Sequence, residues 1–129
     1  MLYINWTDNN MLNIPIIDEQ HRVIVAIINS LYYFNQKGRG DEIFTSTLRI
    51  LEEYTNLHFK TEEDLLKETG YPDFDRHIEL HRMLAVRTHT YTADNVDILE
   101  TLSFLKIWWL NHINVEDRKY AEHVLKMVD

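Results

Sequence analysis

Apolar residues recur along this chain at steps of three and four, the spacing that places side chains on one face of a helix. The first stripe consists of Ile24, Ile27, Ile28, Leu31 and Phe34. It predicts a helix that begins near Asp18 and ends at Gly38, because glycine commonly ends helices. We expect an irregular arm, from Met1 to about Pro15 and containing Trp6, to precede this helix.

Three further stripes predict three further helices. They consist of Phe44, Leu48, Leu51, Thr55, His58, Glu62 and Leu66, then of Phe74, His77, Ile78, His81, Leu84 and Ala85, and finally of Ile98, Leu102, Leu105, Trp109 and His112. Asp41 and Asp73 can cap the second and third helices, and the second should end at Gly70. The fourth should open at Asn95. A last segment, from about Glu116 to Met127, is also helical in pattern, whether or not it bends away from the fourth helix.

The number and length of these helices predict the fold. Four helices of about 20 residues, joined by short loops, pack antiparallel in an up-down-up-down bundle. With three Gly and two Pro, the chain has too few turn residues for many short strands. We therefore expect an all-α, single domain over residues 1–129, with an N-terminal arm and a short C-terminal helix.

Composition narrows the function. The formal net charge is −8, which argues against binding to nucleic acid or to an anionic membrane. The longest strongly apolar run, Val23 to Ile28, is too short to insert into a membrane, and the N-terminus does not resemble a signal peptide, so we expect a cytoplasmic protein. Seven His without a single Cys point to imidazole rather than thiolate chemistry.

Polar residues interrupt each apolar stripe at inward positions. His58 and Glu62 are four residues apart and share the apolar face of the second helix, and His77 and His81 repeat this arrangement on the third. Two more histidines point inward: His112 follows Trp109 by three residues, and His21 precedes Ile28 by two helical turns. A single inward histidine is usually an ordinary core residue with a hydrogen-bond partner.

Five histidines and a glutamate on four buried faces favour a metal site instead, because each unsatisfied polar group would cost roughly 1–3 kcal/mol. Without thiolates soft ions are disfavoured, and imidazole is a poor ligand for calcium or magnesium. A single zinc ion needs only about four ligands and would leave part of the set unused. Iron suits mixed imidazole and carboxylate ligands, and a carboxylate can bridge two irons.

Asp117 is a weaker candidate. It follows His112 by five residues, a step that turns about 140° away from the face of an ideal helix. Asp117 could join the site only if the helix bends or breaks between the two residues. From the spacing alone, a solvated or capping aspartate near Lys119 explains it equally well.

Five segments together resemble the hemerythrin family, in particular the single-domain bacterial hemerythrins, over essentially the whole chain. They are Trp6, IDEQH ending at His21, HFKTEE from His58, YPDFDRHIELH ending at His81 and WWLNHINVEDRKY from Trp108 to Tyr120. The resemblance implies a non-haem di-iron site inside the bundle, in which the aspartate at the end of the fourth helix bridges the metals.

Carried over residue by residue, the resemblance implies two sets of ligands. His77, His81 and His112 would hold one iron, His21 and His58 the other, and Glu62 and Asp117 would bridge both. With an oxo or hydroxo bridge, two octahedral irons would keep one position open for dioxygen, on the iron with fewer histidines. We therefore expect reversible dioxygen binding for storage or delivery, with an oxygen-using enzyme as a recipient, and no enzymatic activity.

Four apolar residues lie next to these ligands or one turn away, and we expect them to line the oxygen pocket: Ile24, Phe59, Trp109 and Ile113. Trp109 stands where the family usually has leucine, and an indole there would narrow oxygen access or slow oxidation. The remaining histidines, His89 and His123, match no ligand position, and we interpret both as surface residues.

Other functions stay open at this level. One is an oxygen- or redox-sensing module, although a bundle that extends close to Met1 and Asp129 favours a free-standing carrier. Another is a di-iron oxidase or a peroxidase-like enzyme, but the Glu-x-x-His motif of ferritin-like oxidases does not occur. A metal store or a plain helical interaction protein is the third.

Overall fold

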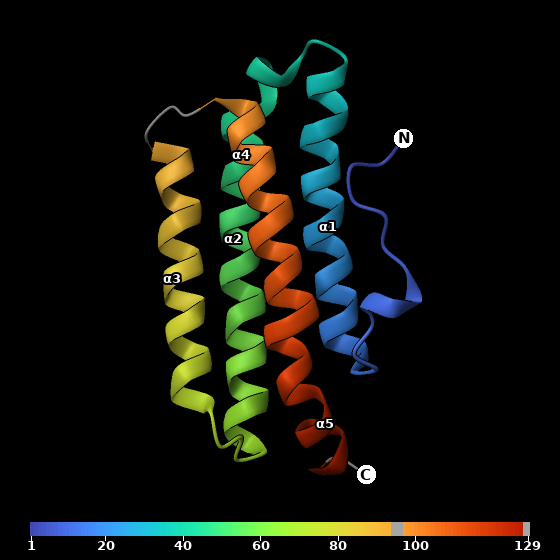
Figure 1. The fold of residues 1–129 in the computed structure, drawn as a ribbon. Coiled ribbons are helices and arrows are strands. Elements are labelled where there is room, and N and C mark those ends of the chain that lie inside the picture. The colour runs from blue at the N-terminus through green and yellow to red at the C-terminus, as the bar shows by residue number, and fades with distance from the viewer. Residues whose placement is uncertain (94–96, 128–129) are drawn as a thin grey trace.

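The helices run up, down, up and down in an antiparallel bundle (Figure 1). The computed structural model describes residues 1–93 and 97–127. The long elements are α1 (Pro15–Gln36), α2 (Gly40–Glu68), α3 (Phe74–Ala93), and a fourth helical stretch of α4 (Ile98–Phe104), the π-helical segments η2 (Leu105–Trp109) and η3 (His112–Glu116), and α5 (Asp117–Met127). The all-α bundle predicted from periodicity is confirmed.

Local chemistry sets the helix ends, not always as predicted. Helix α1 begins at Pro15 rather than near Asp18, because proline suits the first helical position. Helices α1 and α2 end next to Gly38 and Gly70, as expected. Both glycines have positive φ, 72° and 67°, and the amide after each bonds back to the carbonyl of Phe34 or Leu66.

The predicted helix caps agree only in part with the structure. Asp41 does not cap α2, whose N-cap is Arg39, and the Arg39 side chain makes no capping hydrogen bond. Helix α3 begins directly after Asp73, as expected. The predicted start of the fourth helix at Asn95 lies outside the described residues, and the described part begins at Ile98 with Asp97 as a side-chain cap.

The N-terminal arm, which includes the short η1 (Asp8–Asn10), runs along α1 (Figure 1). The Asn29 side chain makes two hydrogen bonds to the backbone of Ile4 in the arm. Its Oδ1 accepts from the Ile4 amide at 2.8 Å, and its Nδ2 donates to the Ile4 carbonyl at 2.9 Å. Asp18 accepts a hydrogen bond from the Leu12 amide at 2.7 Å. The arm is therefore attached to α1 along its length.

The apolar core consists of two clusters. The larger joins all the long helices and includes Ile24, Leu48, Phe59 and Trp109. The smaller contains Leu12, Ile14, Ile17, Leu66, Tyr120, Ala121 and Val124. Along α1 and α2, the buried polar residues His21 and Glu62 fall between members of the two clusters. A polar layer thus lies inside the bundle with apolar core on both sides.

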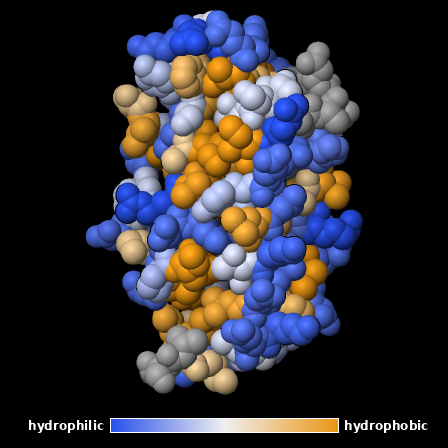
Figure 2. Space-filling view, turned by 180° about the vertical axis from the view of Figure 1, so that it is seen from behind, coloured by the Kyte–Doolittle hydropathy of each residue, from blue (hydrophilic) through white to orange (hydrophobic). Residues whose placement is uncertain are grey.

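On the face seen from behind, apolar patches are separated by hydrophilic side chains (Figure 2). Exposed apolar residues on this and other faces include Ile50, Leu57 and Val86. Among the described helices, none combines the length and the apolar character needed to cross a membrane.

Candidate metal centre

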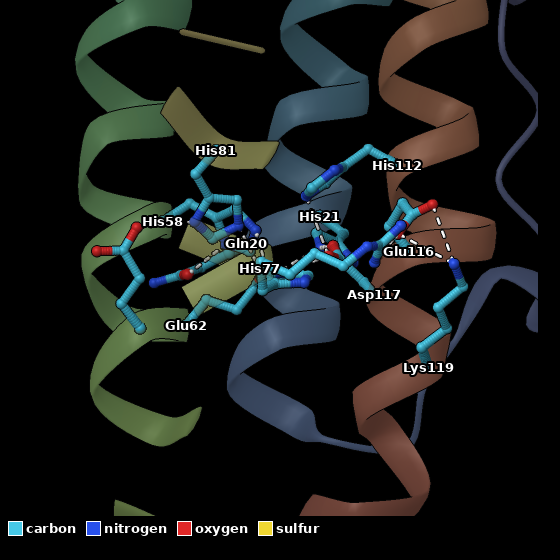
Figure 3. A network of polar contacts seen from close by, with 12 residues as sticks. Gln20, His21, His58, Glu62, His77, His81, His112, Glu116, Asp117 and Lys119 are labelled. Carbon is cyan, nitrogen blue, oxygen red and sulfur yellow. Dashed lines mark hydrogen bonds and ion pairs between the residues drawn. The ribbon is translucent and has the colours of Figure 1, made fainter. Parts of the chain in front are cut away.

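Seven buried polar side chains from all four long helices converge in the layer between the two apolar clusters (Figure 3). They are the residues expected from the sequence: His21, His58, Glu62, His77, His81, His112 and Asp117. None is more than 5% exposed. The structure therefore brings the whole predicted set together, in two groups that share Glu62 and Asp117.

Regular α-helix accounts for most of this convergence. His58 and Glu62 lie one turn apart on α2, and His77 and His81 lie one turn apart on α3. His21 stands on the inner face of α1, between Ile17 and Ile24, both fully buried. Helical periodicity places these residues correctly on the inner faces, because α1, α2 and α3 are regular α-helices around them.

Asp117 reaches the site in a way that periodicity did not anticipate. Asp117 joins the site although the helix does not break between His112 and Asp117: helical structure continues through both residues. Instead, the turn from His112 to Glu116 is π-helical. Because π-helical hydrogen bonds close over five residues instead of four, each turn is wider, and a five-residue step returns to nearly the same face. The π-helical turn therefore places His112 and Asp117 side by side.

The oxygens of Glu62 divide the histidines into two sets. Its Oε1 lies 2.7 Å from Nε2 of His77 and 2.9 Å from Nε2 of His81. Its Oε2 lies 2.9 Å from Nε2 of His58 and 3.7 Å from Nε2 of His21. One oxygen thus faces the histidines of α3, and the other faces those of α1 and α2.

Asp117 divides the histidines in the same way. Its Oδ1 lies 3.1 Å from Nε2 of both His77 and His112. Its Oδ2 lies 3.0 Å from Nε2 of His21. Each carboxylate therefore has one oxygen toward the set of His77, His81 and His112 and the other toward the set of His21 and His58. This is the arrangement of two carboxylates that each span two ligand sets.

Several of these atoms approach closely without the geometry of a hydrogen bond. Nε2 of His58 and Oε2 of Glu62 are 2.9 Å apart, yet neither has a hydrogen-bond partner among the described residues. Nε2 of His112 and both oxygens of Asp117 likewise have none there. Buried polar atoms are normally satisfied. In each of the two groups the donor atoms all lie within 4.8 Å of one another, as donor atoms around a shared ion do, so the donor set fits metal ions.

Without metal, the layer is strongly charged. Burial alone lowers the pKa of His21 and His77, but the carboxylates of Asp117 and Glu62 outweigh burial and raise both values to about 9. Burial raises the pKa of Glu62, and His58 and its neighbours lower it well below its usual value. The pKa of Asp117 is likewise lowered, against burial and the charge of Glu62, by His112 and His21.

Hydrogen bonds from outside the layer orient two of the histidines. Nδ1 of His58 lies 2.8 Å from Oε1 of Gln20, whose Nε2 donates to the Thr61 hydroxyl at 3.1 Å. Nδ1 of His81 lies 2.8 Å from Oε2 of Glu63. Because amide and carboxylate oxygens only accept, both Nδ1 atoms carry the proton and both Nε2 atoms face the site. No sequence pattern singles out Gln20 and Glu63: each stands next to a predicted ligand, but adjacency does not reveal a partner on another helix.

Tyr120 was also missed as a neighbour of the site. Its hydroxyl is buried and has no hydrogen-bond partner in the part of the chain that the structure describes. Its pKa is raised well above the usual value, by burial and then by the charges of Glu62 and Asp117. The ring packs edge-on against His77, with 5.3 Å between the ring centroids.

The expected pocket residues are all buried. The Phe59 ring stacks on the His81 ring, with 4.0 Å between the ring centroids. The Trp109 ring in turn stacks on Phe59, with 5.7 Å between the centroids. Trp109 also packs edge-on against His112. Ile24 on α1 and Ile113 on η3 are buried as well. That these residues line an oxygen pocket stays a prediction.

The other two histidines differ from each other. His89 is exposed, as predicted, beside Glu52. The prediction of a surface residue is wrong for His123, which is half-buried and lies with Nε2 2.7 Å from the Thr69 carbonyl. This contact of His123 joins α5 to the end of α2.

Trp6 of the N-terminal arm packs edge-on against His21, with 6.3 Å between the ring centroids.

A model of the hemerythrin HHE cation binding domain matches residues 12–124, which include the seven converging side chains. The chain belongs to the hemerythrin family. Hemerythrins bind non-haem iron and dioxygen. The resemblance inferred from sequence segments is thereby confirmed, and the buried layer is the place where a hemerythrin domain of this sequence can hold metal.

Bacterial hemerythrins are similar over nearly the whole chain. The bacteriohemerythrin of Stenotrophomonas maltophilia is 32% identical over 133 residues, covering 96% of this chain and 83% of the relative. That of Methylococcus capsulatus is 30% identical over 127 residues, covering 94% and 96%. A crystal structure of wild-type hemerythrin superposes with a TM-score of 0.82 at 28% identity, covering 95% of this chain and 98% of that chain.

Proposed function

We propose that this hemerythrin domain binds dioxygen reversibly at a non-haem di-iron centre and serves in oxygen storage or delivery. The observation that carries the proposal is the division of oxygens in Glu62 and Asp117. A carboxylate that bound one ion would turn both oxygens, or one alone, toward one set of histidines. Here both carboxylates span the two sets, which supports two ions per chain.

The ligand assignment follows the two groups. His77, His81 and His112 would hold one iron, and His21 and His58 the other, with Glu62 and Asp117 shared. When bound, the iron pair supplies the electrons and the open coordination position that dioxygen needs. The half with fewer histidines, His21 and His58, would leave room for dioxygen.

The protein's own residues contribute an apolar surrounding on two sides of the polar layer. Phe59 stacks on His81, Trp109 stacks on Phe59 and packs edge-on against His112, and an apolar cluster lies on each side of the layer. A dry surrounding slows the loss of reduced oxygen species to solvent. The buried carboxylates and histidines of the layer all serve as ligands in this assignment, which favours binding over turnover. Delivery to an oxygen-using enzyme is part of the proposal.

The test is an absorption spectrum of the protein loaded anaerobically with ferrous iron, recorded before and after exposure to air and again under vacuum. We expect about two irons per chain and a visible charge-transfer band that appears with oxygen and disappears under vacuum. Steady oxygen consumption would point to an oxidase instead. Failure to retain iron after iron-replete expression, or retention of zinc alone, would contradict the proposal.

A further inference from the structure

We propose that Glu63 and Gln20 make the two halves of the metal centre unequal, so that the half with three histidines binds its ion first and more tightly. The inference rests on the proposed function, because it takes the seven converging side chains as metal ligands. It goes beyond that function by assigning roles to two residues outside the ligand set.

The half with three histidines has an anionic partner behind one ligand. Nδ1 of His81 donates to Oε2 of Glu63 at 2.8 Å, while its Nε2 faces Oε1 of Glu62 at 2.9 Å. Glu63 therefore sits directly behind a ligand and adds a negative charge to this half. Its side chain is 30% exposed, so solvent screens part of the charge, but the hydrogen bond to the buried imidazole is direct.

The half with two histidines has a neutral partner. Nδ1 of His58 donates to the amide oxygen of Gln20 at 2.8 Å, and the Thr61 hydroxyl accepts from the Gln20 amide nitrogen. The second histidine of this half, His21, has a buried Nδ1 without a hydrogen-bond partner among the described residues. This half therefore gains orientation at one ligand from a neutral partner, and among the described residues no carboxylate is hydrogen-bonded to Nδ1 of either of its histidines.

The difference in partners translates into a difference in affinity. A carboxylate behind a ligating histidine makes the imidazole more basic and attracts the cation, whereas an amide mainly orients the ring. Both effects add to the larger number of histidines in the half that contains His81. Because Glu62 and Asp117 are shared, their charges do not offset this difference.

A cavity in the protein surface supports the same order of ion binding, with the half that has three histidines first. A cavity of about 500 Å³ opens between α2 and α3, and Glu63, His81 and Phe59 lie in its wall. The ligands of the other half, His21 and His58, are not part of this wall and are fully buried. Of the seven ligands, His81 lies in this wall, so at this cavity the half with three histidines is the one nearer the surface.

The experiment is an anaerobic titration of the chelator-treated full chain with Co²⁺, followed by calorimetry and visible absorption. We expect two separate binding steps for the unchanged protein. Glu63→Gln keeps an acceptor for His81 but removes the charge, and it should weaken the first step roughly 10–100-fold while changing the second much less. Glu63→Asp should restore most of the affinity, and Gln20→Glu should strengthen the second step.

The matched control is Glu53→Gln, which removes one charge from an exposed position on the same helix. It should leave both steps unchanged. In the Co²⁺-loaded protein, the shifted NMR resonance of the His81 Nδ1 proton should move in Glu63→Gln and not in the control, which a purely structural role for Glu63 would not produce. If Gln20→Glu does not fold, the three substitutions at Glu63 and Glu53 decide the matter.

Two failures can be told apart. Two equal binding steps, or a Glu63→Gln variant that behaves like the control or weakens the second step, would overturn the inference while two bound ions leave the proposed function intact. A chain that binds no ion would overturn the proposed function itself.

Discussion

Glu62 is the side chain on which most of the site depends. It is fully buried, and its two oxygens lie within 2.9 Å of three histidine nitrogens from two helices. In the metal-free protein it compensates histidine charge, and in the proposed centre it binds both ions. Replacing Glu62 should therefore destabilise the metal-free protein and also weaken metal binding.

Glu62→Gln should therefore weaken metal binding and folding together. The substitution keeps the size of the side chain but removes its charge, so we expect at least a 10-fold loss of affinity for metal. The metal-free protein should lose about 3–5 kcal/mol of unfolding free energy, because buried histidines lose their partner. Metal content after dialysis and urea denaturation measure the two effects. A variant that retains full metal content would contradict the bridging role.

Trp109 tests the aromatic wall of the site. It is 1% exposed and contacts the layer through Phe59 and His112. Trp109→Leu should open space beside the ligands, so we expect faster oxygen binding and release or faster autoxidation, and a loss of about 2–3 kcal/mol of stability. Trp108→Leu is the matched control, since Trp108 is 44% exposed. Identical stopped-flow traces for Trp109→Leu and the unchanged protein would remove the idea.

At the scale of elements, the fourth helical stretch shows how local backbone geometry adapts to the site. Regular α-helix on α1, α2 and α3 suffices to point five of the ligands inward. Only the wider turn of η3 lets His112 and Asp117 share a face. π-Helical turns are uncommon and often occur at functional sites, which agrees with the position of this one.

The N-terminal arm is the element that covers the His21 side of the bundle, and Asn29 holds it. Asn29→Ala removes both hydrogen bonds to Ile4. We expect a loss of roughly 1–3 kcal/mol and a red shift of tryptophan fluorescence as Trp6 becomes more exposed. Ser30→Ala, one residue away on an exposed position, is the control. Fast hydrogen exchange at the Ile4 amide only in Asn29→Ala would support the role, and equal exchange in both variants would contradict it.

At the scale of the whole molecule, the charged layer makes stability depend on pH. His21 and His77 have a pKa raised from 6.5 to about 9, so their contribution is complete below pH 6.5 and is lost as pH rises through 9. Glu62 and Asp117 have a lowered pKa, so their contribution is present above about pH 4 and is lost as pH falls. The metal-free bundle should be most stable between these limits.

We therefore expect the chelator-treated protein to lose on the order of 3 kcal/mol between pH 6.5 and 9. The metal-loaded protein should not, because metal requires neutral histidines and competes with protons. Denaturation curves of both forms across this range, at constant ionic strength, measure the difference. Parallel pH profiles for the two forms would show that the histidines do not exchange protons for metal.

The bundle and most of its site were determined by the sequence alone. Periodicity is a property of the chain, so stripes such as Leu48, Leu51 and Leu66 predict helices, and the inward positions of His58, Glu62, His77 and His81 follow from the same count. The hemerythrin resemblance added Asp117, which the spacing left undecided.

The tertiary structure decided what depends on contacts between helices or on departure from ideal geometry. The π-helical turn that brings in Asp117 breaks the constant angle per residue that every periodicity argument assumes. The partners Gln20 and Glu63 bind ligands on neighbouring helices, His123 meets a carbonyl 54 positions away, and a linear pattern carries no information on such pairs. Which histidines each carboxylate oxygen faces depends on how the helices pack, because the residues around a side chain in space determine its direction.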